Sequence, residues 1–94
     1  MNNKKLTLKD FFTSDKKLVI HCDTEEKANK LLKAFDDYGM CWYGGERYID
    51  FNNWSVYQEE TCYSNISGFG FVKFYKKNGI KIYEFEDVDL KGEK

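Results

Sequence analysis

The sequence predicts an α+β protein in which an antiparallel sheet of about four or five strands carries one main helix, residues 24–38, across one face. Three observations predict this class. The chain has one amphipathic helical stripe, several short apolar or alternating segments, and an Asn-Gly dipeptide between two such segments near its end. A chain of 94 residues is expected to form a single domain, 1–94, with frayed ends at 1–5 and 91–94.

The first half of the chain contains the clearest element boundaries. Residues 6–12 are expected to form a short helical turn, and residues 18–22 form an apolar run that predicts a strand. Asp23 is expected to cap the main helix, with Glu26 three residues later completing a capping box. Apolar residues in that helix recur at i, i+3, i+4 and i+7, and Gly39 supplies a left-handed stop.

The second half is expected to hold three short elements before a terminal hairpin: a strand at 40–43, a helix at 53–60 capped by Asn53, and a strand at 61–66.

The terminal hairpin is predicted from Asn78-Gly79, which suits a type I′ turn between residues 69–77 and 80–88. The register that this turn imposes turns one apolar face toward the main helix. The opposite face is polar but also carries three apolar side chains, so we expect the N-terminal segment, a second subunit or a partner to cover it. These side chains are Phe71, Tyr75 and Ile82.

Composition and charge restrict the function. A net charge of −1 and a pI near 5.8 remove the electrostatic reason to expect a protein that coats nucleic acid or anionic membrane, although a local basic patch remains open. No apolar run approaches 18 residues, and the first twenty residues lack the features of a signal peptide. We therefore expect a cytoplasmic protein without membrane contact.

The cysteines and the single histidine predict no metal, no cofactor and no catalysis. Cys22, Cys41 and Cys62 leave one thiol unpaired in any intramolecular scheme, so they are expected to be reduced core residues. No CxxC or HxxxH spacing is present, and no motif of a known catalytic class occurs. His21 is expected to be a core or hydrogen-bonded residue linked to Asp23, and a reactive pair with Cys62 is the less favoured alternative.

The most informative segment is 41–63, which holds both tryptophans and Arg47, the only arginine beside fourteen lysines. A guanidinium grips phosphate or carboxylate at two points and stacks on rings, so we expect a ligand site here. The alternative is that the rings are ordinary core residues and that Arg47 pairs with Glu46 or Asp50. The expected site consists of Arg47, Trp42, Tyr43, Trp54 and Tyr57.

Several motifs between residues 17 and 88 resemble those of small uncharacterised phage and prophage accessory proteins of low-GC bacteria. They are VIHCDTEEKANKLLKAF, Gly39-Met40-Cys41-Trp42, the pair Trp54 and Tyr57, Thr61-Cys62-Tyr63, and YEFEDV. The resemblance implies a role in counter-defence against bacterial immunity, without a map of functional residues.

Two hypotheses from different classes follow, both non-enzymatic. In the first, the protein is a sponge, expected to be oligomeric, that sequesters a nucleotide-type immune signal between the rings and Arg47. In the second, it docks as an inhibitor on a bacterial defence protein such as a CRISPR effector, through an acidic edge. That edge consists of Glu84, Glu86, Asp87 and Asp89.

Overall fold

A four-stranded mixed sheet in the order β4-β3-β2-β5 forms the centre of the computed structural model, which describes residues 5–90. β2 (Leu18–His21), β3 (Thr61–Ser64) and β4 (Phe69–Phe71) are antiparallel neighbours, whereas β5 (Lys81–Glu84) runs parallel to β2. The α+β class is confirmed, but the sheet is not wholly antiparallel. Apart from Lys5, the ends expected to fray lie outside the described residues.

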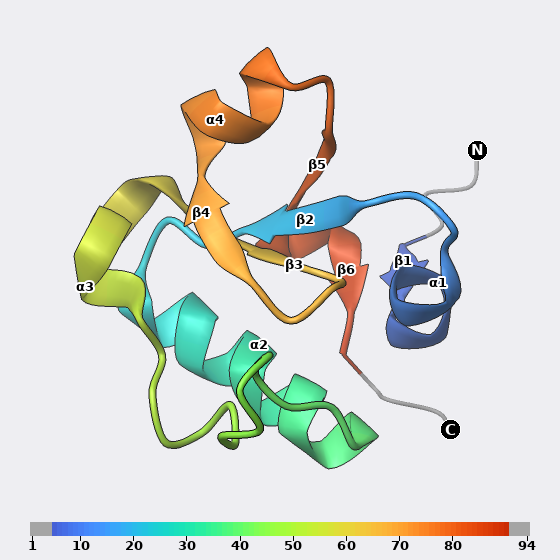
Figure 1. Cartoon of the computed structure of the whole chain (residues 1–94), viewed down its shortest axis with the longest axis vertical. Helices are drawn as coiled ribbons and strands as arrows, with labels where there is room; N and C mark the ends of the chain where they lie inside the picture. Colours follow the sequence, from blue (N-terminus) through green and yellow to red (C-terminus); the bar gives the residue numbers. More distant parts are fainter. Residues whose placement is uncertain (1–4, 91–94) are drawn as a thin grey trace.

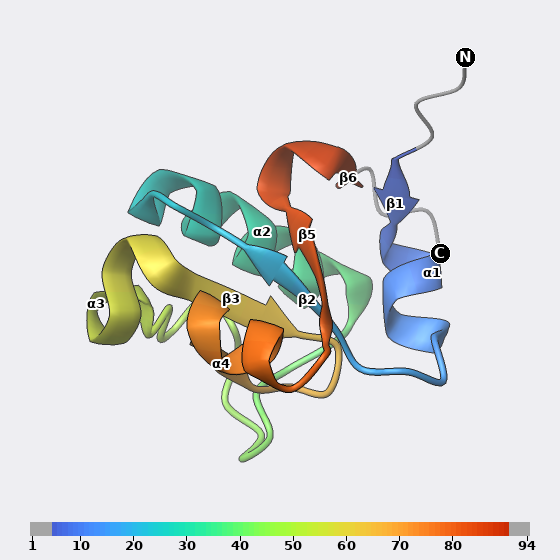
Figure 2. The same ribbon diagram turned by 90° about the horizontal axis from the view of Figure 1, so that it is seen from above.

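Helices cover both faces of this sheet (Figure 1). α2 (Glu25–Tyr38) lies on one side and α4 (Val72–Lys77) on the other. A second, two-stranded parallel sheet joins the start of the described chain to its end, beside α1 (Figure 2). The remaining elements are β1 (Leu6–Thr7), α1 (Leu8–Thr13), α3 (Trp54–Tyr57), β6 (Val88–Asp89), and the 3₁₀ turns η1 (Gln58–Glu60) and η2 (Phe85–Asp87).

α2 forms as its sequence predicts, with a one-residue correction at its start. The N-cap is Thr24, whose hydroxyl accepts a hydrogen bond from the Lys27 backbone N–H at 3.2 Å. Asp23 instead pairs with the Lys27 side chain at 2.8 Å, so the expected capping box with Glu26 is wrong. Gly39 ends the helix in the left-handed region, at φ 103°.

The main core lies between α2 and the sheet. All four residues of the α2 stripe are buried, and the ring of Phe11 from α1 stacks on Phe35 at 5.5 Å. Ile20 from β2 and Tyr63 from β3 complete this side of the sheet. The buried stripe consists of Ala28, Leu31, Leu32 and Phe35.

The prediction of a terminal hairpin is wrong, because residues 72–77 form a helix. The chain leaves β4, turns through α4 and returns as β5, which pairs with β2 instead of with β4. Tyr75, expected on an uncovered face, is 3% exposed and packs with Val19 and Cys62. Gly70 allows this, since a Cβ there would lie 2.8 Å from the Tyr75 hydroxyl. The second face of the sheet is therefore covered by the chain itself.

Residues 40–53 form a long loop instead of the strand expected at 40–43. Its only pairing of the β type among the described residues is an isolated bridge between Cys41 and Arg47. The short helix after it also differs from expectation: Asn53 has φ 56° and makes no side-chain cap, and the backbone N–H of Trp54 binds Asn52 Oδ1 instead. The strand expected at 61–66 is confirmed as the shorter β3.

Candidate functional site

The loop of residues 40–53 is held in place by aromatic side chains that donate hydrogen bonds to backbone carbonyls. An aromatic ring buries a large apolar area while its N–H or O–H reaches a polar partner, so it can anchor a segment that lacks regular structure. Trp42 Nε1 donates to the Phe51 carbonyl at 2.9 Å, and the Tyr63 hydroxyl donates to the Asn52 carbonyl at 2.6 Å. Directly after the loop, Trp54 Nε1 donates to the Cys22 carbonyl at 3.0 Å and so fixes the start of α3.

The tip of the loop is a tight turn that projects Tyr43. The Trp42 backbone N–H donates to the Glu46 carbonyl at 2.9 Å, and the Gly45 N–H donates to the Trp42 carbonyl at 2.8 Å. Gly45 has φ 96°, a conformation that side chains other than glycine rarely adopt. Tyr43 is 92% exposed, which leaves its ring free to contact another molecule.

An open hollow of about 490 Å³ lies beside this turn. Four of the nine lining residues are aromatic, and Glu46 is the only charged residue among the described residues that line it. A hollow with several rings and one carboxylate attracts a cationic group, because the faces of aromatic rings carry partial negative charge. The lining residues are Trp42, Tyr43, Gly44, Glu46, Phe51, Asn53, Ser67, Gly68 and Phe69.

Exposed apolar side chains lie in and next to the hollow. The lining residue Phe51 is 58% exposed, and so is Ile66, which directly precedes the lining residue Ser67. Exposed apolar groups at a hollow are typical of sites that bind other proteins.

The structure brings together only two of the five expected ligand residues. Trp42 and Tyr43 line the hollow, but Arg47, Trp54 and Tyr57 do not. The half-buried Trp54 donates its indole N–H to the Cys22 carbonyl, and the ring of Tyr57 packs on Phe71 with centroids 4.9 Å apart. Sequence reasoning missed two lining residues: Phe51, which lies in the segment 41–63 but was not among the expected ligand residues, and Phe69, which lies outside that segment.

Arg47 grips a carboxylate at two points, as its chemistry predicts, but the carboxylate belongs to α2. Its Nε lies 3.2 Å from Asp36 Oδ1 and its Nη2 lies 2.8 Å from Oδ2. This contact lowers the pKa of the Asp36 carboxyl and raises the pKa of Arg47. The alternative partners expected from sequence, Glu46 and Asp50, are therefore wrong, and the guanidinium joins the loop to α2.

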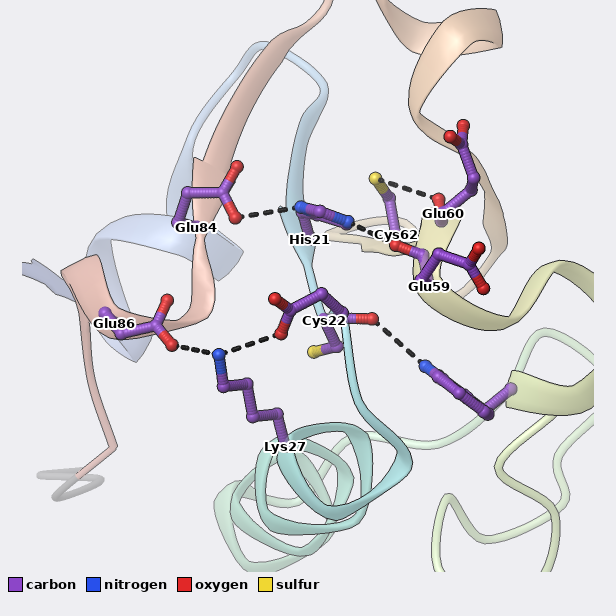
Figure 3. Close-up of polar contacts among 10 residues, drawn as sticks. His21, Cys22, Lys27, Glu59, Glu60, Cys62, Glu84 and Glu86 are labelled. Atoms are coloured by element: carbon purple, nitrogen blue, oxygen red, sulfur yellow. Dashed lines mark hydrogen bonds and ion pairs between the residues drawn. The ribbon is translucent and has the colours of Figure 1, made fainter.

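The expected acidic edge is partly neutralised within the protein (Figure 3). Glu84 pairs with His21, and Glu86 pairs with Lys27, which also holds Asp23. These hydrogen bonds with Lys27 lower the pKa of Glu86. Asp87 is exposed in η2, whereas Asp89 belongs to the half-buried strand β6. The four carboxylates therefore do not form one free acidic surface.

His21 is a structural residue that links three elements. Its Nδ1 lies 2.8 Å from Glu84 Oε1 in β5, and its Nε2 lies 2.6 Å from the Glu59 carbonyl in η1 (Figure 3). Both partners are acceptors, which favours the imidazolium that donates from both nitrogens. Partial burial lowers the pKa of His21, but the hydrogen bonds to Glu59 and Glu84 outweigh it and leave the pKa raised. The hydrogen-bonded role was predicted, though with Asp23 as its partner.

The thiols do not form a reactive site with His21. Cys62 stands opposite His21 in the β2–β3 register, but burial raises the pKa of its thiol to about 12. Burial also raises the pKa of Cys22. Both are reduced and buried as expected, whereas Cys41 is exposed, so its placement in the core was wrong. Among residues 5–90, no group of three or more potential metal ligands comes together.

No family model, curated protein or solved structure matches this chain. Within the described part of the chain, no helix has the length and apolar character needed to cross a bilayer. The resemblance of residues 17–88 to phage accessory proteins stays a prediction from sequence.

Proposed function

We propose that this chain is a non-enzymatic docking protein whose aromatic hollow receives a basic side chain, arginine above all, from a partner protein. The observation that carries this proposal is the composition of the hollow: four aromatic residues and Glu46 line it, and none of its described lining residues is cationic. A guanidinium could stack on a ring and pair with Glu46 at the same time.

The surroundings of the hollow support a protein as the partner. Tyr43, at 92% exposure, and Phe51, at 58%, stand beside the hollow on a loop whose backbone is already anchored. Aromatic side chains on a pre-organised backbone lose little conformational freedom on binding and often supply much of the binding energy of an interface.

Sequestration of a nucleotide immune signal remains a second proposal for the same hollow. Its volume of about 490 Å³ falls within the range of small-molecule pockets, and a base could stack on its rings. Phosphate contacts would have to come from outside the described lining or from the second subunit of an oligomer. Arg47 would have to leave Asp36 to take part.

Docking through the acidic edge is the weaker version of the protein-binding proposal, because His21 and Lys27 already occupy Glu84 and Glu86. The resemblance to phage accessory proteins would make the partner a bacterial defence protein in the host cytoplasm. A CRISPR effector is one such partner.

The test is an NMR titration that follows the indole N–H of Trp42. A capped glycine-serine peptide with one central arginine is compared with the same peptide carrying citrulline, which has a similar shape but no charge. We expect saturable shifts at Trp42 and Tyr43 with the arginine peptide only, at millimolar affinity, which corresponds to about −4 kcal/mol.

Two variants and one matched control locate the contact. Glu46→Gln removes the charge of the hollow and Tyr43→Ala removes its exposed ring, so each should weaken the response to arginine. Asp87→Asn removes the same charge from the expected acidic edge and should leave the response unchanged. Equal responses to arginine and citrulline would refute the proposal. Saturation by adenosine monophosphate alone would favour nucleotide sequestration.

A further inference from the structure

A row of aromatic rings follows the β4 edge of the sheet from α3 to α4. The ring centroids of Tyr57 and Phe71 are 4.9 Å apart, those of Phe71 and Phe74 are 5.9 Å apart, and those of Phe74 and Tyr75 are 5.3 Å apart. Phe74 is 47% exposed and Tyr57 is 36% exposed, so the middle and one end of the row are open to solvent.

Lysines surround the α4 end of this row. Lys73, Lys76 and Lys77 are exposed at positions i, i+3 and i+4 of α4, a spacing that places them on one side of the helix. The same spacing places Phe74 next to Lys77. From outside the helix, Lys17 lies with its Nζ 5.8 Å from the centroid of the Tyr75 ring.

These lysines differ from those of α2 in their lack of a counter-ion within the described part of the chain. Each of the α2 lysines Lys27, Lys30 and Lys33 forms an ion pair with a carboxylate. None of the four lysines around the row forms an ion pair with any residue from 5 to 90. Positive charge that is left without a partner beside exposed rings is available to an external anion.

The two ends of the aromatic surface have opposite charge. The row continues from Tyr57 to Phe69, at 5.8 Å, and Phe69 lines the hollow that contains Glu46. The hollow end is therefore acidic, whereas the α4 end is basic. Carboxylates also lie near the start of α4, because Glu59 and Glu60 precede Thr61, which pairs with Phe71. An anion would bind nearer the lysine-rich end of α4.

We propose that the row from Tyr57 to Phe74, together with the lysines of α4, binds single-stranded nucleic acid. Unpaired bases stack on exposed rings without regard to sequence, while lysines contact the phosphates between them. Phe74 is the only large apolar side chain on the exposed side of α4, which favours a nucleic acid over a membrane surface. The site is separate from the proposed docking hollow and shares no residue with its lining.

The test is fluorescence anisotropy of labelled twelve-nucleotide oligo(dT) and oligo(U) with the whole chain at several salt concentrations. We expect saturable binding. The logarithm of the association constant should fall linearly with the logarithm of the salt concentration, with a slope near −2 for about three phosphate contacts at roughly 0.7 each. Lys76→Gln/Lys77→Gln should reduce the slope by about 1.4. Phe74→Ala should weaken binding about 5- to 150-fold, the range for loss of one stacked base.

Matched controls separate this site from a general charge effect. Lys30→Gln/Lys33→Gln changes the net charge equally but on α2, and Ile49→Ala removes an apolar side chain with the same 47% exposure as Phe74. Both should bind as the wild type does. The proposal is overturned if the α2 variant weakens binding as much as the α4 variant, if no saturable binding occurs, or if phosphatidylserine vesicles bind more tightly than the oligonucleotides.

Discussion

Two buried tyrosines, Tyr48 and Tyr63, should respond in opposite ways to the same substitution by phenylalanine. Tyr63 is fully buried, and its hydroxyl donates to the Asn52 carbonyl at 2.6 Å. Tyr48 is 1% exposed, but its hydroxyl has no hydrogen-bond partner among the described residues. Burial raises the pKa of Tyr48, and the nearby Ser67 side chain, which does not reach hydrogen-bond geometry, opposes this rise.

The expected effects follow from the difference in hydrogen bonding. Tyr63→Phe removes a bond and leaves the Asn52 carbonyl without its partner, which should destabilise the fold by about 1–2 kcal/mol. Tyr48→Phe removes a buried hydroxyl that has already lost its water, so it should stabilise the fold by up to about 1 kcal/mol. The Tyr48 ring keeps its contacts with Trp42 at 4.6 Å and Phe35 at 5.2 Å.

The assay is thermal and urea unfolding of the two variants and the wild type, followed by circular dichroism. A difference of about 2 kcal/mol between the variants corresponds to roughly 8–16 °C in melting temperature for a domain of this size. If Tyr48→Phe destabilised the protein by more than 1 kcal/mol, the conclusion that the Tyr48 hydroxyl lacks a hydrogen bond would be refuted. A hydrogen bond from Tyr48 to Ser67 would then be present in solution.

Three further predictions concern other parts of the fold. The pKa of His21 is raised from 6.5, so its contribution to stability is fully present below pH 6.5 and is lost as the pH rises through the pKa of the folded state. The urea midpoint of the wild type should therefore fall over that pH range, and the midpoint of His21→Gln should fall less. An equal fall in both would contradict this. Gly39→Ala should cost about 1 kcal/mol through its φ of 103°, while Gly68→Ala, which does not need a left-handed backbone, should cost less by the same measurement. Iodoacetamide should alkylate only Cys41 in the folded protein, because the Cys62 thiol is buried and its pKa is raised to about 12. Mass spectrometry counts the labelled thiols, and rapid labelling of Cys62 would show that its strand opens.

Arg47 shows how far sequence reasoning reached into the candidate site. Its isolation among lysines predicted a two-point contact with a phosphate or carboxylate in a ligand site, whereas in the structure that two-point contact is made with Asp36 of the same chain. The partner was missed because Asp36 lies eleven positions earlier, on a helix that reads as solvent-facing at that point. Trp42 and Tyr43, two of the expected ligand residues, line the hollow, and Phe69 joins them because β4 lies beside the loop.

The region after β4 shows a different limit of the sequence. Asn78-Gly79 suits a hairpin turn, but a left-handed glycine also ends a helix, and Gly79 at φ 71° ends α4. The choice between them depends on Tyr75, whose burial against Val19 and Cys62 favours the helix. No local signal in residues 72–77 reports that contact.

Elements whose signals are local could be predicted from the sequence. α2 follows from its apolar stripe and from Gly39, and β2 follows from its short apolar run, because these patterns act within a few residues. Tertiary structure decided the parallel pairing of β5 with β2, the helical state of α4, the partner of Arg47 and the lining of the hollow. Each of these depends on contacts between residues distant in the chain, such as His21 and Glu84, whose free energy outweighs local preference.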